Sequence, residues 1–180
     1  MTEYQFPEFY SFPPFFTLQD NPITRQKQLD LWVDHVIKYT TTHKITELLP
    51  TSSSQSLPLF NNPSIKRALD PQDIQTVLDH VQKSGYGTWL TADKSKFGLS
   101  TINTAELAAA LHKWADQYDL MSSVETLDEI INGTMSRGQP FYNSPMKIVY
   151  NALLELENQG LASLYEGDDM GSLGVKFIRP

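Results

Sequence analysis

The sequence predicts a mostly helical protein with small β-hairpins, an α+β fold of two tandem winged-helix domains preceded by an extended Pro/aromatic arm. Three observations predict it. Apolar residues recur at helical spacing in several separate segments. The apolar stripe from Ile74 to Gly85 recurs 75 residues later as Val149 to Gly160, and a hairpin pattern follows each copy. Aromatic residues and prolines fill the first twenty positions, where neither pattern occurs.

The first twenty residues form the predicted arm. Seven of the twenty aromatic residues of the chain lie in its first sixteen positions, interleaved with Pro7, Pro13 and Pro14. Proline fixes φ, lacks an amide donor and favours an extended residue before it. We therefore expect an extended, largely polyproline II segment over residues 1–20. It contains two F-P-x-F units, Phe6-Pro7-Glu8-Phe9 and Phe12-Pro13-Pro14-Phe15.

Two roles are open for this arm, docking on a partner or folding back on the first domain. The arm holds more aromatic residues than a small domain buries beside its own core, and a patch of them left in water favours aggregation. A polyproline II segment is preformed for aromatic-lined grooves and loses little entropy on binding. We therefore expect partner docking by Phe6, Pro7, Phe9, Tyr10, Phe12, Pro13, Pro14, Phe15 and Phe16.

Residues 21–102 are predicted to form the first winged-helix domain. Pro22 and Thr24 mark the start of its long helix, Asp70 is the expected N-cap of a later helix, and Gly85 is expected to end that helix. Its elements, in chain order, are a helix over 25–42, a strand near 45–49, one or two turns at 65–69, a helix from 71 to 84, and a hairpin near 89–90 and 97–102.

Residues 103–180 are predicted to form the second domain in the same order. Thr104 is the expected cap of its first helix, and Ser144 is the expected cap of a helix with Pro145 at its first position. Between and after them we expect a strand near 123–126, a small helix over 127–131, and a hairpin near 161–165 and 173–178. This order of elements is the winged-helix plan, a helix-turn-helix variant.

A winged helix often binds nucleic acid, so a tandem winged-helix nucleic-acid-binding or transcription factor is the alternative. The chain has a formal net charge of -7, and the third helix of each domain carries no arginine and no basic stripe. Both features oppose contact with a phosphate backbone. We therefore place nucleic-acid binding below protein binding and expect no nucleic-acid partner.

The negative charge is concentrated in the second domain. Residues 1–101 carry nine basic and ten acidic side chains, whereas residues 102–180 carry five and eleven. A surface of one sign steers a partner of the opposite sign, although such a bias is often only a solvated surface. The candidates for contact with a basic partner are Glu125, Asp128, Glu129, Glu166, Asp168 and Asp169.

No catalytic, cofactor or metal site is predicted. The chain has no cysteine, and its four histidines lack metal-ligand spacing. The phosphate-binding and hydrolase motifs are absent. The longest apolar run, Leu107 to Leu111, is far shorter than a membrane span. Glu3 and Glu8 lie where a signal peptide is basic, so we expect a cytoplasmic protein. Because the catalytic motifs are absent, we expect that it is not an enzyme.

Tyr10 to Gln19, followed by Thr24 to Leu29 and Trp32, resembles the opening of the Vps25-type subunits of the endosomal sorting complex ESCRT-II. The segments Pro58 to Asn62 and Gly174 to Phe177 fit the same family. The resemblance spans nearly the whole chain and is most specific in the arm.

The resemblance implies tandem winged helices and a non-catalytic role in multivesicular-body sorting of ubiquitinated cargo. The P-P-x-F element, Pro13-Pro14-Phe15-Phe16, would dock on the two other ESCRT-II subunits, and two copies of the chain would join each Y-shaped complex. The second winged helix would recruit and activate an ESCRT-III subunit. Recruitment to endosomal membranes would be peripheral, and we expect it to be indirect because no basic amphipathic helix is present.

Overall fold

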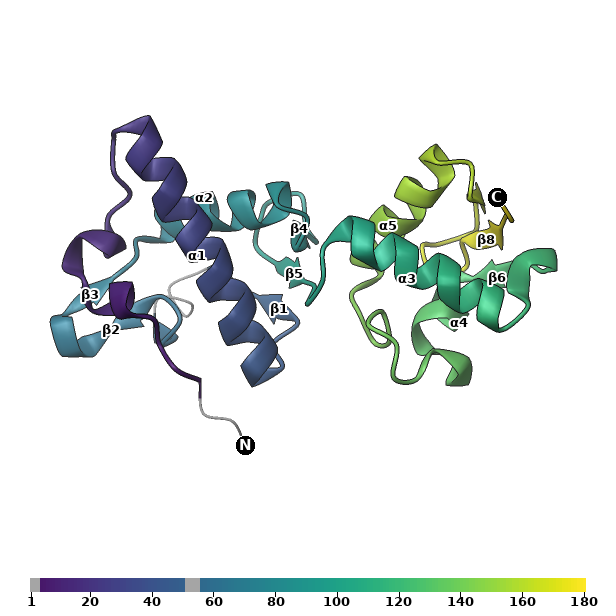
Figure 1. Ribbon diagram of the computed structural model, residues 1–180, viewed down its shortest axis with the longest axis horizontal. Coiled ribbons are helices and arrows are strands. Elements are labelled where there is room, and N and C mark those ends of the chain that lie inside the picture. The colour runs from purple at the N-terminus through teal and green to yellow at the C-terminus, as the bar shows by residue number, and fades with distance from the viewer. Residues whose placement is uncertain (1–3, 51–55) are drawn as a thin grey trace. The chain divides into compact units, whose positions relative to one another are not determined.

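The computed structural model of this protein describes residues 4–50 and 56–180, so residues 1–3 of the predicted arm lie outside it. The chain divides into two compact units, Met1–Thr101 and Ile102–Pro180, each with its own hydrophobic core. Both combine helices with a small sheet (Figure 1), which confirms the prediction of a mostly helical protein with small β-hairpins.

Within residues 4–50 and 56–101, the first unit contains two α-helices and a three-stranded antiparallel sheet of order β1-β5-β4. Asn21 caps α1, because its side chain accepts the N–H groups of Ile23 and Thr24. The described elements are η1 (Glu8–Ser11), η2 (Pro13–Phe16), α1 (Pro22–His43), β1 (Glu47–Leu48), β2 (Asn61–Asn62), η4 (Pro63–Ile65), β3 (Arg67–Ala68), α2 (Pro71–Lys83), β4 (Gly87–Trp89) and β5 (Phe97–Leu99).

The second unit also has a three-stranded antiparallel sheet, of order β6-β8-β7, together with three α-helices. Its elements are α3 (Thr104–Gln117), η5 (Leu120–Ser122), β6 (Glu125–Thr126), α4 (Leu127–Asn132), η6 (Thr134–Ser136), α5 (Met146–Asn158), β7 (Ala162–Tyr165) and β8 (Gly174–Phe177). The order helix, strand, helix, helix and hairpin is the one that the sequence predicts.

The internal repeat extends to individual hydrogen bonds. α2 and α5 are offset by 75 residues, and Gly85 and Gly160 follow them with φ of 84° and 75°. The Gln82 side chain accepts the N–H of Trp89 at 3.0 Å, and 75 residues later the Glu157 side chain accepts the N–H of Leu164 at 2.9 Å. In both units a side chain of the helix before the hairpin, α2 or α5, therefore blocks the open edge of the hairpin, where another strand would otherwise pair.

Two predicted helix starts are wrong by one residue, and the start of α2 is confirmed. Asn103, and not Thr104, caps α3, because Asn103 and Glu106 form a reciprocal capping box. α5 begins at Met146, with Pro145 at the N-cap position and the predicted cap Ser144 outside it. Asp70 does precede α2, but its side chain makes no capping bond.

The predicted turns at 65–69 are only partly present, because Ile65 ends the 3₁₀ turn η4 but Arg67 and Ala68 form a strand. Lys66 has a left-handed φ of 53° and reverses the chain after η4. Arg67 then pairs with Asn62 and Ala68 with Asn61 in an antiparallel register. Propensity alone does not show this pairing, because it depends on a single residue in an uncommon conformation.

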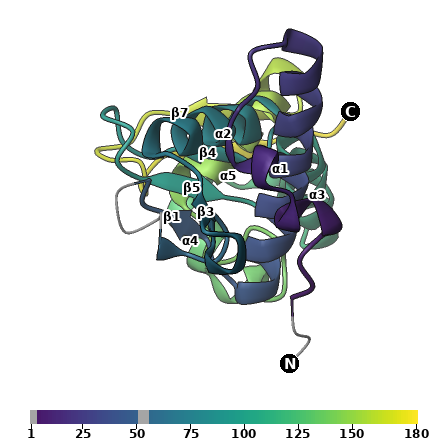
Figure 2. The same ribbon diagram turned by 90° about the vertical axis from the view of Figure 1, so that its left-hand side faces the viewer.

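The prediction of an extended arm is also wrong. Residues 8–16 form the two 3₁₀ turns η1 and η2, and Figures 1 and 2 show the segment folded back beside α1. The N–H groups of Tyr10, Phe12 and Phe15 donate to the carbonyls of Pro7, Phe9 and Phe12, each at 3.0 Å. The prolines are compatible with these turns, because none of the three N–H donors belongs to a proline and because the φ that proline imposes also occurs in a 3₁₀ turn.

Candidate partner-docking surface

The structure divides the residues predicted for docking into two groups. Tyr10, Phe15 and Phe16 are buried in the core of the first unit, and Pro7 and Phe9 are half-buried. Exposed are Phe6 (41%), Phe12 (59%), Pro13 and Pro14. The folded-back alternative therefore describes the inner side of the segment, and only its outer side is available to a partner.

Aromatic stacking on Trp32 of α1 anchors the inner side. The ring of Phe15 lies parallel to the indole, with centroids 4.3 Å apart and an interplanar angle of 15°. Phe16 meets the same indole edge-on at 5.7 Å, and Tyr10 meets Phe16 edge-on at 5.5 Å. Trp32 is fully buried as a result. Aromatic pairs of this kind add roughly 0.5–1.5 kcal/mol each to the burial of their surface.

The buried side chain of Gln28 on α1 fixes the backbone of the same segment. Its Nε2 donates to the carbonyls of Phe15 and Thr17, both at 2.9 Å, and its Oε1 accepts the N–H of Gln19 at 3.0 Å. The indole Nε1 of Trp32 also donates to the Phe15 carbonyl, at 3.2 Å. Gln28 was missed in the sequence, where its only signal is a polar residue beside the apolar stripe of the helix.

Tyr10 ties the segment to the β2 region. Its hydroxyl donates to the carbonyls of Pro58 and Asn61, the latter at 2.7 Å, and its own carbonyl accepts from Asn62 Nδ2 at 2.8 Å. Burial raises the pKa of Tyr10 to about 12. These bonds hold the second face of the segment, so both faces that meet the domain are fixed.

His35 lies at the centre of an aromatic cluster under the segment. Its Nε2 donates to the Leu59 carbonyl at 3.2 Å, and its Nδ1 accepts from the Tyr4 hydroxyl at 2.7 Å, the arrangement of a neutral ring. The rings of Tyr4, Phe6, Phe9, Tyr10, Trp32 and Tyr39 surround it. Burial lowers the pKa of His35 to about 4, because the imidazolium form is poorly solvated there.

What the segment leaves exposed is a ridge and a groove. We define the ridge as Phe12, Pro13 and Pro14. Beside it runs an open groove of about 380 Å³, lined by Phe9, Phe12, Pro14, Phe15, Gln19, Thr24, Lys27, Gln28 and Leu31. Thr24, Lys27, Gln28 and Leu31 share one face of α1 by their spacing.

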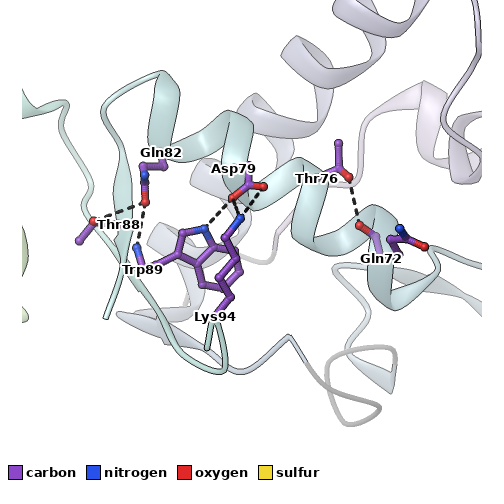
Figure 3. A network of polar contacts seen from close by, with 7 residues as sticks. All are labelled: Gln72, Thr76, Asp79, Gln82, Thr88, Trp89 and Lys94. Atoms are coloured by element: carbon purple, nitrogen blue, oxygen red, sulfur yellow. Dashed lines mark hydrogen bonds and ion pairs between the residues drawn. The ribbon is translucent and has the colours of Figure 1, made fainter. Parts of the chain in front are cut away.

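On α2, the helix that would enter a DNA groove, the side chain of Asp79 binds the first wing. Asp79 accepts from Trp89 Nε1 and from Lys94 Nζ, both at 2.7 Å, and Lys94 lies 5.3 Å from the centroid of the Trp89 ring (Figure 3). Lys96, the other lysine of this wing, pairs with Glu47 at 2.7 Å. Both wing cations are neutralised within the unit, which disfavours the nucleic-acid alternative.

Two of the six acidic candidates of the second unit come together. Asp128 and Asp169 line one open hollow of about 590 Å³ with Thr126, Met146, Met170, Gly171 and Ser172. The N–H of Ser172 donates to Asp169 Oδ1 at 2.8 Å, and this bond lowers the pKa of that carboxyl. Glu125 accepts from Ser123 Oγ and Glu129 from Thr126 Oγ1. Glu166 and Asp168 are exposed and do not line the hollow.

Among residues 4–50 and 56–180, no group of three histidine, aspartate or glutamate side chains is placed to hold a metal ion. Across the same described ranges, no helix has both the length and the apolar character that crossing a bilayer requires.

The comparisons with known proteins identify the family. Residues 9–145 match the family described as ESCRT-II complex subunit. Vacuolar protein-sorting-associated protein 25 of Homo sapiens is 34% identical over 175 residues, which cover 97% of this chain and 98% of that protein. This chain belongs to the Vps25 family of ESCRT-II subunits. The Drosophila melanogaster member is 34% identical over 99% of this chain, and the Arabidopsis thaliana member is 30% identical over 98%.

Solved structures agree with this fold. A crystal structure of subunit VPS25 of the endosomal trafficking complex ESCRT-II superposes with a TM-score of 0.75 at 22% identity, covering 96% of this chain and 98% of the other. The VPS25-family fold also appears in a crystal structure of the endosomal complex ESCRT-II (VPS22/VPS25/VPS36), with a TM-score of 0.72 at 22% identity.

Gln28→Leu is expected to lower the free energy of unfolding by roughly 1–3 kcal/mol, because the buried bond to the Phe15 carbonyl is lost and the Gln19 N–H loses its acceptor. Urea denaturation followed by tryptophan fluorescence measures it. The control is Gln26→Leu on the same helix, where the lost amide bond to Asp30 is exposed. Equal losses in both variants would show that the amide of Gln28 does not hold the segment.

Acid is expected to destabilise the first unit through His35. The unfolded ring titrates near 6.5 and the folded ring near 4, so the unfolded state binds the extra proton between these values. The stability contribution is therefore complete above pH 6.5, and about 3 kcal/mol of it is lost as the pH falls to 4. Denaturation midpoints across this range measure the slope. His35→Gln should flatten it, and a slope unchanged in that variant would assign the effect to other groups.

Proposed function

We propose that this chain is a non-catalytic assembly subunit whose N-terminal ridge docks on the two other ESCRT-II subunits. The observation that carries the proposal is the division of one segment between a fixed inner side and an exposed outer side. Phe12 is 59% exposed at the tip of a segment whose neighbours Tyr10, Phe15 and Phe16 are buried. The solved relative described above is part of a complex with VPS22 and VPS36, which supports the choice of partners.

Preorganisation makes such a ridge an effective ligand. The stacking on Trp32 and the amide bonds of Gln28 order the backbone after Pro14, and the bonds of Tyr10 order it before Pro13. Little conformational entropy is then lost on binding, so the burial of Phe12, worth roughly 1.5–3 kcal/mol, goes into affinity. In the P-P-x-F element, Phe15 and Phe16 lie in the core and are not available to a partner. We therefore assign docking to Pro13 and Pro14 of this element together with Phe12.

The first F-P-x-F unit serves the packing of the segment itself. The ring of Phe6 stacks on Tyr10 with centroids 4.2 Å apart, and Phe9 contacts Phe15 at 4.4 Å. We assign this copy mainly to holding the second copy in place, with the partly exposed edge of Phe6 as an outer contact.

The double substitution Phe12→Ala/Pro13→Ala is expected to abolish co-purification with the two other ESCRT-II subunits, because both side chains lie outside the core. Native mass spectrometry of the complex purified through this chain checks it and counts its copies, of which we expect two. Ile23→Ala is the control, since Ile23 is 71% exposed on α1 but lines neither ridge nor groove. A variant complex of wild-type mass would refute the docking role of the ridge.

For the second unit we propose recruitment and activation of an ESCRT-III subunit through the hollow between Asp128 and Asp169. Two carboxylates line it together with the thioether side chains of Met146 and Met170, and no cation lines it. Methionine adapts to varied apolar partners, and the carboxylates select a basic segment. Such a contact would place the complex in multivesicular-body sorting of ubiquitinated cargo, with peripheral and indirect recruitment to endosomal membranes.

Asp128→Asn/Asp169→Asn is expected to weaken binding of the ESCRT-III subunit roughly tenfold and to reduce its dependence on salt. Asparagine keeps the acceptor that Ser172 uses, so the loop stays intact. The matched control is Glu166→Gln/Asp168→Asn, which removes the same charge from exposed positions outside the hollow. Titration calorimetry at two salt concentrations measures both. Equal weakening in the two variants would mean that net charge acts and the hollow does not.

A further inference from the structure

The groove beside the ridge is a second feature of the same surface, and ridge docking leaves it unexplained. One wall belongs to the folded-back segment, with Phe9, Phe12 and Pro14, and the other belongs to α1, with Thr24, Lys27 and Leu31. Leu31 is 41% exposed although it lies among apolar neighbours. A groove of about 380 Å³ with apolar walls has room for at least one large side chain from outside.

The groove is preformed. Gln28, which lines it, uses its amide in bonds to Phe15, Thr17 and Gln19, and these bonds set the distance between the two walls. Phe15, which also lines it, is held flat against Trp32. The bonds and the stacking hold both side chains in place, so the floor of the groove is formed before a ligand binds.

Lys27 gives the groove its chemical preference. It is the charged side chain among the lining residues, and it is exposed. Over the part of the chain that the structure describes, Lys27 has neither a hydrogen bond nor an ion pair, whereas Lys38, farther along α1, pairs with Asp34 at 3.1 Å. A single unpaired cation at the rim of an apolar groove favours a ligand that brings an apolar side chain and a carboxylate together.

We propose that docking is reciprocal: a neighbouring ESCRT-II subunit inserts a large apolar side chain, flanked by an aspartate or glutamate, into the groove of this chain. The inference rests on the proposed function, because it takes the ridge and the groove to face the same partner. The ridge enters the partner, the partner enters the groove, and Lys27 pairs with the incoming carboxylate at the rim. The two insertions fix the orientation of the contact, which a single ridge does not.

The test compares groove variants with the ridge variant in binding to the purified pair of other ESCRT-II subunits, measured by titration calorimetry. Leu31→Ser and Lys27→Glu are each expected to weaken binding roughly tenfold or more, with the effect of Lys27→Glu shrinking as salt rises. Lys38→Glu makes the same charge change on the same helix outside the groove and is expected to alter binding less than threefold. Circular dichroism and the melting temperature verify the fold of every variant.

Each outcome decides between the two proposals. Wild-type affinity in both groove variants, with binding lost in Phe12→Ala/Pro13→Ala, would overturn the reciprocal insertion and leave ridge docking in place. Wild-type affinity in all three would overturn both. If the isolated chain forms a dimer that Leu31→Ser dissociates, the occupant is a second copy, and the proposal of a partner side chain falls. If Leu31→Ser disturbs the fold, the exposed Lys27→Glu still decides.

Discussion

The first unit depends on the contact between the N-terminal segment and Trp32. Phe15 stacks on one face of the fully buried Trp32 indole and Phe16 meets it edge-on, while His35 and Phe60 lie against the same ring. A unit of about a hundred residues has few other apolar side chains to place over so large a ring. The same contact orders the carbonyls that Gln28 binds, and thereby the two walls of the groove. The segment is therefore a part of the domain core that also carries the surface for a partner.

The sequence predicted the order of the elements well and the conformation of this segment wrongly. Phe6, Phe9, Phe12 and Phe15 recur every third residue. A polyproline II helix and a 3₁₀ helix both have three residues per turn, and both accept the φ of proline. The spacing therefore does not distinguish the two conformations. The excess of aromatic residues favoured a docking arm, but the first unit buries Tyr10, Phe15 and Phe16 in its own core. On α1, His35 and Gln28 widen the buried face, and their burial depends on partners far from them in the chain.

The repeat of 75 residues separates what the fold requires from what each unit does. Two features recur in both units. A glycine of positive φ follows α2 and α5, and a helix side chain accepts an N–H from the edge strand, β4 or β7. Both serve the fold, because the helix must end before the hairpin and the open strand edge must be protected from pairing. The surface groups do not recur. Asp79 receives the wing lysine Lys94 in the first unit, whereas the residue 75 positions later is Leu154. Leu154 offers no carboxylate to a lysine of the second hairpin. That hairpin instead carries the exposed acidic residues Glu166, Asp168 and Asp169. The docking candidates of the two units consequently differ in sign and position.

The two faces of the N-terminal segment are thermodynamically coupled. Phe15 covers Trp32 and also lines the groove, so any state in which the segment leaves α1 loses the groove and the ridge together. A partner that binds both features binds only the docked state, and by mass action it stabilises the packing on Trp32 as well as the complex. Conversely, the bonds of Gln28 and Tyr10 keep the docked state populated before the partner arrives, which removes a conformational cost from association. The burial of Tyr10, Phe15 and Phe16 inside the domain thus holds the exposed Phe12 in a position from which it can contact a partner.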